Sequence, residues 1–152
     1  MSSFTLSQPV AAPPAVVFAV LTDVANLPAA IPGITKAELL TPGPIGVGSR
    51  VAETRTMFGR PATETFEVVA FDPPTRFTMT AVSCGVEYRC EHTITPDGAG
   101  SRLELAMAMT PRTTFAKLMS PLAKLMGGTM KKMIAKDLAS LAAAAEKRAG
   151  GS

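Results

Sequence analysis

The last third of the chain, from about residue 112 to residue 147, is one long amphipathic segment. Its spacing predicts a long helix with a single broad apolar face, and Pro121 and the Gly127-Gly128 pair mark places where that helix kinks or begins anew. Such a face cannot remain in water, so the rest of the chain has to cover it. The residues of the face are Phe115, Leu118, Met119, Leu122, Leu125, Met126, Met130, Met133, Ile134, Leu138 and Leu141.

The region before this helix predicts an antiparallel sheet as the covering surface. Between Gly33 and Thr110 the strings "TPGPIGVGS", "FGRP", "DPPT", "SCG" and "PDGAG" are typical turns, and no helix-length segment separates them. The opening "SFTLSQPVAA" reads as a further strand, and "AVVFAVLTDVANLPAAI" reads as two short helices. We therefore predict an α+β fold, in which a curved antiparallel sheet of about six to seven strands wraps around the long helix, with two short helices after the first strand.

Length and composition predict one domain over residues 1–152, because 152 residues with 47% hydrophobic content suffice for a single core. We interpret residues 149–152, with the sequence "AGGS", as a flexible tail after the helix. No apolar run reaches the length of a membrane span and no signal peptide is recognisable, so we expect a cytoplasmic protein. With one Tyr and no Trp available to stack on bases, we expect no nucleic-acid partner.

The stretch "VEYRCEHTI", residues 86–94, contains the only Tyr and the only His of the chain. Its period-2 alternation places Tyr88, Cys90 and His92 on the inward face of a half-buried strand. Tyr88 and His92 are then on the order of 13 Å apart, too far for a hydrogen-bonded pair, while Cys90 and His92, at roughly 6.6 Å, can touch. We interpret Cys90 as a buried core thiol and expect Cys84 to be a free thiol as well, with no metal site, because CxxC spacing is absent.

The predicted hairpins extend this inward face to the neighbouring strands. Phe77, Met79 and Ala81 lie on one side of the Tyr88 row, and Leu105, Met107 and Met109 lie on the other. The same register carries Ala70, Val68, Phe66 and Glu64 inward, followed by Met57, Arg55, Glu53 and Val51, with Arg55 as the cross-strand neighbour of Glu64. Three charged residues then point toward the core, unless a bulge turns them to solvent. Methionines on both the helix and the sheet favour an adaptable apolar cavity between them.

Several strings of the chain resemble the SRPBCC superfamily, also called START-like or helix-grip proteins, and its polyketide cyclase/dehydrase and coenzyme Q-binding branch. The resemblance covers about residues 4 to 146. It implies the helix-grip fold and a ligand such as a lipid, a quinone or a polyketide-like aromatic compound, and it offers no catalytic motif to carry over. We expect no cofactor. The strings are "APPAVVFAVLTDVANLPAAIPGI", "GPIGVGSR" and "FEVVAFDPPTRFTM".

Our first hypothesis is therefore a module that binds a hydrophobic small molecule between the sheet and the last helix. Tyr88 and His92 supply its polar contacts. The expected ligand-binding residues are Phe66, Met79, Tyr88, Cys90, His92, Met107, Met109, Leu118, Leu122 and Met126.

Two alternatives stay open. An enzyme for polyketide-like cyclisation or dehydration needs a base, for which His92 and Glu64 are the candidates, and a donor for the enolate oxygen, for which Tyr88 and Arg55 are the candidates. An accessory protein could instead dock on a membrane or an acidic partner through the basic face formed by Lys117, Lys124 and Lys131, which recur every seventh residue. The oligomeric state cannot be predicted from these patterns.

Overall fold

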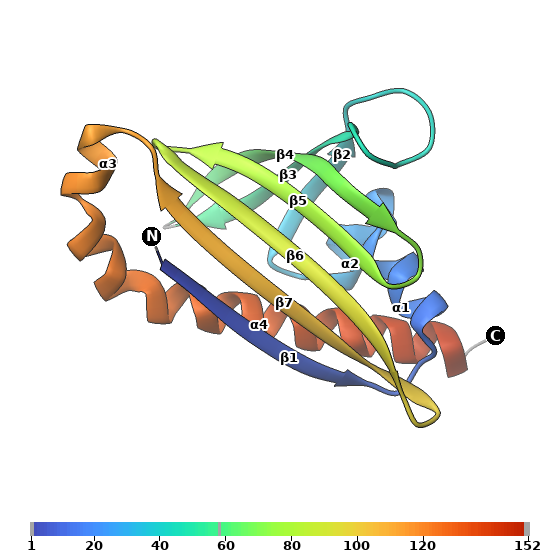
Figure 1. Cartoon of the computed structure of the whole chain (residues 1–152). Coiled ribbons are helices and arrows are strands. Elements are labelled where there is room, and N and C mark those ends of the chain that lie inside the picture. The colour runs from blue at the N-terminus through green and yellow to red at the C-terminus, as the bar shows by residue number, and fades with distance from the viewer. Residues whose placement is uncertain (1, 58, 151–152) are drawn as a thin grey trace.

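Seven antiparallel strands form one sheet in the order β1-β7-β6-β5-β4-β3-β2, as Figure 1 shows. This computed structural model describes the backbone of residues 2–57 and 59–150, and the side chains of that part apart from residues 2, 57 and 122–127. The predicted antiparallel sheet is confirmed, and the structure adds that the first strand pairs with β7. The strands are β1 (Ser2–Val10), β2 (Ile34–Leu39), β3 (Arg50–Met57), β4 (Arg60–Asp72), β5 (Arg76–Ser83), β6 (Val86–Asp97) and β7 (Gly100–Pro111).

The helices lie on one side of this sheet. Pro14, at the first turn of α1 (Pro14–Leu21), suits that position because its missing N–H has no partner in a helix there. The one-turn helix η1 (Val24–Asn26) and α2 (Leu27–Ala30) follow, in agreement with the prediction of short helices after the first strand. The long helix α4 (Ser120–Gly150) packs against β1, α1 and α2, and Figure 1 shows it running along the length of the sheet.

The C-terminal helical segment is broken into two helices. The short helix α3 spans Thr114–Leu118, and Thr113 caps its N-terminus. The Oγ1 of Thr113 accepts a hydrogen bond from the Ala116 N–H at 3.1 Å. Pro121 cannot continue a preceding helix but fits the first turn of a new one, and α4 accordingly starts at Ser120. One expectation is wrong for this reason: Leu118 is 73% exposed on α3 instead of facing the sheet. Lys117 lies on α3 and Lys131 on α4, and the side chain of Lys124 falls outside the described residues, so the basic face stays a prediction.

A bulge in β4 changes which residues of that strand face the helix. Val68 pairs with Met79, but Ala70 pairs with Thr78, so one extra residue lies between them. The predicted inward position of Ala70 is wrong, because the bulge turns Phe71 inward in its place. Residues before the bulge keep the predicted face.

The solid part of the core lies where α1 and the C-terminal half of α4 meet the sheet. Three rings, from Phe18 on α1, Phe71 on β4 and Phe77 on β5, pack edge to face with centroid separations of 5.3, 6.0 and 6.3 Å. Leu138, Leu141, Ala142 and Ala145 of α4 belong to the same cluster of buried side chains.

Candidate functional site

A cavity of about 270 Å³ lies between the sheet and α4. Most of its wall is apolar, and the polar side chains come from β3, β4, β6 and α4. The sheet contributes Glu53, Arg55, Ala62, Glu64, Phe66, Met79, Ala81, Tyr88, Cys90, His92, Leu105 and Met107. The helices contribute Leu21, Leu27, Ile31, Met130, Met133, Ile134, Asp137, Leu138 and Leu141.

Most of the side chains expected at a ligand site border this cavity. All four candidates for catalysis, His92, Glu64, Tyr88 and Arg55, line it, as do Phe66, Met79, Cys90 and Met107. Met109 instead packs against the buried core outside the lining. Leu118 is exposed on α3, and Leu122 and Met126 fall outside the described side chains.

The inward face of β3 and β4 carries charge, because Glu53, Arg55 and Glu64 all line the cavity. Their pairing differs from the expectation. The hairpin closes at the Met57–Arg60 pair, which places Glu64 opposite Glu53 and Arg55 opposite Ala62. The predicted Arg55–Glu64 neighbours are wrong because the turn is two residues shorter than that register requires, and turn length sets the register of a hairpin.

Arg55 pairs with Asp137 of α4 across the cavity wall. Its Nη2 donates to Asp137 Oδ2 at 2.7 Å and its Nη1 to Oδ1 at 3.3 Å, a two-pronged geometry that arginine and carboxylate groups favour. The side chains are 20% and 11% exposed. Gly33 lies against this pair, since a Cβ there would be 3.0 Å from Arg55 Nη1. The ion pair thus fastens α4 to β3.

Asp137 is the site residue that sequence reasoning missed. It stands three positions after Ile134 and four before Leu141, within the apolar face of α4. A carboxylate at such a position needs a buried partner, because charged side chains are almost never buried alone. That signal was available in the sequence and points to an arginine on the facing sheet.

The two glutamates of the cavity have few partners. Glu64 Oε1 accepts a hydrogen bond from Ser83 Oγ at 2.8 Å. Glu53 makes no hydrogen bond or ion pair with any residue that the structure describes. Burial raises the pKa of Glu53, and the nearby Arg55 opposes that shift while Asp137 adds to it. Sequence reasoning had placed Glu53 on this face without giving it a role.

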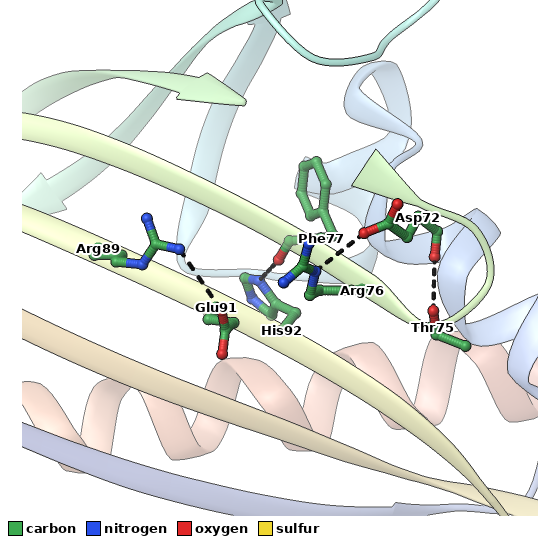
Figure 2. A network of polar contacts seen from close by, with 7 residues as sticks. All are labelled: Asp72, Thr75, Arg76, Phe77, Arg89, Glu91 and His92. Carbon is green, nitrogen blue, oxygen red and sulfur yellow. Dashed lines mark hydrogen bonds and ion pairs between the residues drawn. The ribbon is translucent and has the colours of Figure 1, made fainter. Parts of the chain in front are cut away.

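His92 is buried and neutral. Its Nδ1 donates to the Phe77 carbonyl oxygen at 3.2 Å, as Figure 2 shows, so Nε2 carries the lone pair. Burial lowers the pKa of His92 to about 4, although the bond to Phe77 acts in the opposite direction. No hydrogen bond joins Nε2 to a described residue. His92 can therefore accept a hydrogen bond from a bound molecule, but it is a weak base.

Tyr88 and Cys90 keep their protons at neutral pH. Burial, with the Glu64 carboxylate nearby, raises the pKa of Tyr88, so the phenol remains a hydrogen-bond donor. Burial raises the pKa of Cys90 to about 12, so it remains a thiol and not a nucleophilic thiolate. Cys90 is buried and both cysteines are free, which agrees with the interpretation from the sequence.

The opposite face of the same strands carries ordinary surface pairs. Figure 2 shows the pair of Arg89 with Glu91, 3.7 Å apart, and the pair of Arg76 with Asp72, 3.0 Å apart, and all four side chains are partly exposed to solvent. Over residues 2–57 and 59–150, no helix is long and apolar enough to cross a membrane. The described His, Cys, Asp and Glu side chains form no group of three or more that could hold a metal ion.

Comparisons with known proteins agree with this architecture. Residues 1–146 match the family model described as polyketide cyclase / dehydrase and lipid transport. No curated protein matches the chain by sequence.

Solved structures with the same fold share few residues with this chain. The Zhui aromatase/cyclase from a Streptomyces species superposes with a TM-score of 0.77 at 20% identity, covering 97% of this chain and 94% of that one. A protein from Thermus thermophilus gives 0.78 at 17% identity, with 95% and 97% covered. A START superfamily protein from Mycobacterium smegmatis gives 0.71 at 15% identity, with 98% and 97% covered. These similarities establish the fold alone.

Proposed function

The chain belongs to the polyketide cyclase / dehydrase and lipid transport family, and on that premise we propose that it binds an apolar small molecule in the cavity between the sheet and α4. The observation that carries the proposal is the cavity itself, a partly open, mostly apolar space with a few polar groups converging on it. Lipids, quinones and polyketide-like aromatic compounds fit this description.

The size of the cavity narrows the ligand. An engineered protein cavity of about 150 Å³ lined by aliphatic and aromatic residues holds one benzene. At about 270 Å³ this cavity has room for a fused bicyclic ring system or an equivalent length of lipid chain. Methionines from both walls, Met79, Met107, Met130 and Met133, can adjust to ligands of different outline.

The direct test is mass spectrometry of small molecules released from freshly purified protein, together with uptake of an apolar fluorescent dye. We expect one bound molecule per chain, or one dye in its place. The variant Ala81→Phe fills the cavity from the middle of β5 and should lose the dye, whereas Val82→Phe, on the neighbouring exposed position, should keep it. Equal dye uptake by both variants would contradict the proposal.

Acid–base catalysis on a bound carbonyl compound is the second candidate. One observation favours it: the raised pKa of Glu53 makes its carboxylate a stronger base, and the neutral Tyr88 phenol in the same cavity can hold an enolate oxygen. Glu64 is an alternative base, while the lowered pKa of His92 makes it the weakest candidate.

Deuterium exchange of the acidic protons of β-tetralone, a bicyclic ketone, tests this second function without a known substrate. An enzyme of this kind accelerates exchange in deuterated buffer, and Glu53→Gln or Glu64→Gln lowers the rate by about a hundredfold or more while the dye is still bound. Exchange no faster than in buffer alone, with the ketone demonstrably bound, would leave only the binding function.

A further inference from the structure

The charges that line the cavity do not balance. Three carboxyl groups, from Glu53, Glu64 and Asp137, face one cation, Arg55, and no described lysine is part of the lining. His92 adds no charge, because it is neutral at physiological pH. A cavity with this lining has an excess of negative charge when its carboxyl groups are ionised.

Arg55 cannot compensate that excess, because it is already engaged. Both of its terminal nitrogens donate to the two oxygens of Asp137, at 2.7 and 3.3 Å. Gly33 closes another side of the guanidinium group, with no room there for even a methyl group without displacement. An anionic group of a ligand would have to compete with a buried, two-pronged ion pair for this arginine.

Glu53 and Glu64 are the carboxyl groups left over. They are directly opposite on β3 and β4 and face the same cavity, so their Cβ atoms are about 5 Å apart. Ser83 donates one neutral hydrogen bond to Glu64, and Glu53 has no partner among the described residues. Two neighbouring carboxylates in a buried site repel each other and are costly to desolvate, unless a cation or a proton lies between them.

A second and independent feature points to a ligand that donates hydrogen bonds. His92 is only 7% exposed, its Nδ1 is bound to the Phe77 carbonyl oxygen, and no hydrogen bond joins its Nε2 to a described residue. His92 comes from β6, two strands away from β4, so this unfilled acceptor is separate from the glutamate pair. Glu53 and His92 Nε2 are thus acceptors without described partners in the same cavity, beside the Tyr88 phenol, which can donate or accept.

We propose that the cavity selects apolar molecules that carry a protonated amine and rejects those that carry a carboxylate, with Glu53 and Glu64 as the ion-pair partners of the amine. This inference rests on the proposed binding function and names its ligand class. An ammonium group between the two carboxylates gains charge-assisted hydrogen bonds and removes their repulsion. A carboxylate in the same place adds a third negative charge to the pair.

Three naphthalene compounds of nearly equal shape test the proposal: naphthylmethylamine, naphthylmethanol and naphthoic acid. Their dissociation constants are measured by isothermal titration calorimetry at neutral pH, where the amine is protonated and the acid ionised. We expect the amine to bind about tenfold or more tightly than the alcohol, since hydrogen bonds to charged groups are the stronger class. The acid should bind more weakly than the alcohol.

Two variants assign the effect to the glutamates. Glu53→Gln keeps the shape and removes the charge, and should lower the affinity for the amine by about tenfold while leaving that for the alcohol unchanged. Glu67→Gln is the matched control, because Glu67 is exposed on β4 and does not line the cavity.

The outcomes separate this inference from the function on which it rests. If the alcohol binds and the amine has no advantage, or if Glu53→Gln keeps the preference for the amine, the charge selection is refuted and the binding function stands. Tighter binding of the acid than of the amine would also refute the charge selection and leave the binding function intact. If none of the three compounds binds and the apolar dye is also refused, both the inference and the proposed function fall.

Discussion

Acidification from pH 7.5 to pH 4.5 should destabilise this protein through His92. In the unfolded chain a histidine takes up a proton near pH 6.5, but burial lowers the pKa of folded His92 to about 4. Its stabilising contribution is therefore complete above pH 6.5 and is lost as the pH falls from 6.5 toward 4, because only the unfolded state gains the proton. At about 1.4 kcal/mol per pH unit, the loss by pH 4.5 is roughly 2.5 kcal/mol.

The assay is urea unfolding followed by circular dichroism at both pH values, for the wild type and for His92→Gln. Glutamine can still donate to the Phe77 carbonyl oxygen but does not titrate. Carboxyl groups contribute to the pH dependence of both proteins, and the raised pKa of Glu53 even favours the folded state on acidification, so only the difference between the proteins reports His92. The wild type should lose roughly 2.5 kcal/mol more than the variant between the two pH values.

Parallel losses in the two proteins would refute the reasoning. Because the chain contains a single histidine, its imidazole proton resonances provide an independent check. A titration of the folded protein centred near pH 6.5 would show that His92 is hydrated and not enclosed as its surroundings require.

Two further substitutions follow from close contacts in the structure. Asp137→Asn removes the partner of Arg55 and should lower the free energy of unfolding by about 2 kcal/mol. This loss is smaller than the roughly 3 to 5 kcal/mol typical of a broken buried ion pair. The reason is that the Arg55 side chain is 20% exposed and Glu53 remains near it. Gly85→Ala should destabilise by about 1 to 2 kcal/mol more than Gly59→Ala. The two glycines have nearly the same positive φ of 76° and 77°, but a Cβ at Gly85 collides with the Thr113 side chain, whereas a Cβ at Gly59 meets nothing.

Both substitutions are read by urea unfolding at neutral pH. Lys136→Ala, on an exposed neighbour of the aspartate, is the control for Asp137→Asn and should change stability by less than about 0.5 kcal/mol. A change equally small in Asp137→Asn would mean that the ion pair contributes nothing to stability. Equal losses for the two glycine variants would mean that the threonine moves aside without cost.

Regular alternation made much of the sheet predictable. The inward row of Tyr88, Cys90 and His92 follows from the period-2 pattern of one strand, and the tight turns carry that register to Met79 and Met107. The order of elements then leaves one long apolar helix to cover the sheet. Local chemistry sufficed here because each step depended on residues close in the sequence.

Features that depend on one extra or one missing residue were not predictable. The bulge before Ala70 has no distinctive composition, and the length of the hairpin after Met57 decided which residues face Glu64. The restart of the helix at Ser120 left Leu118 in solvent. Asp137 was overlooked because it follows a lysine-rich stretch that reads as a solvated surface, although its position belongs to the apolar face.

The bulge in β4 also has an evolutionary consequence. On one side of it Phe71 belongs to the aromatic cluster, and on the other Ala62, Glu64 and Phe66 border the cavity, roughly 15 to 30 Å along the strand from Phe71. Substitutions at such separations add up independently, so the chain can change its choice of ligand through three adjacent inward positions without loosening the aromatic cluster. One strand thereby contains a segment that supports the core and a segment that faces the ligand. A library randomised at positions 62, 64 and 66 should yield mostly folded proteins with altered binding.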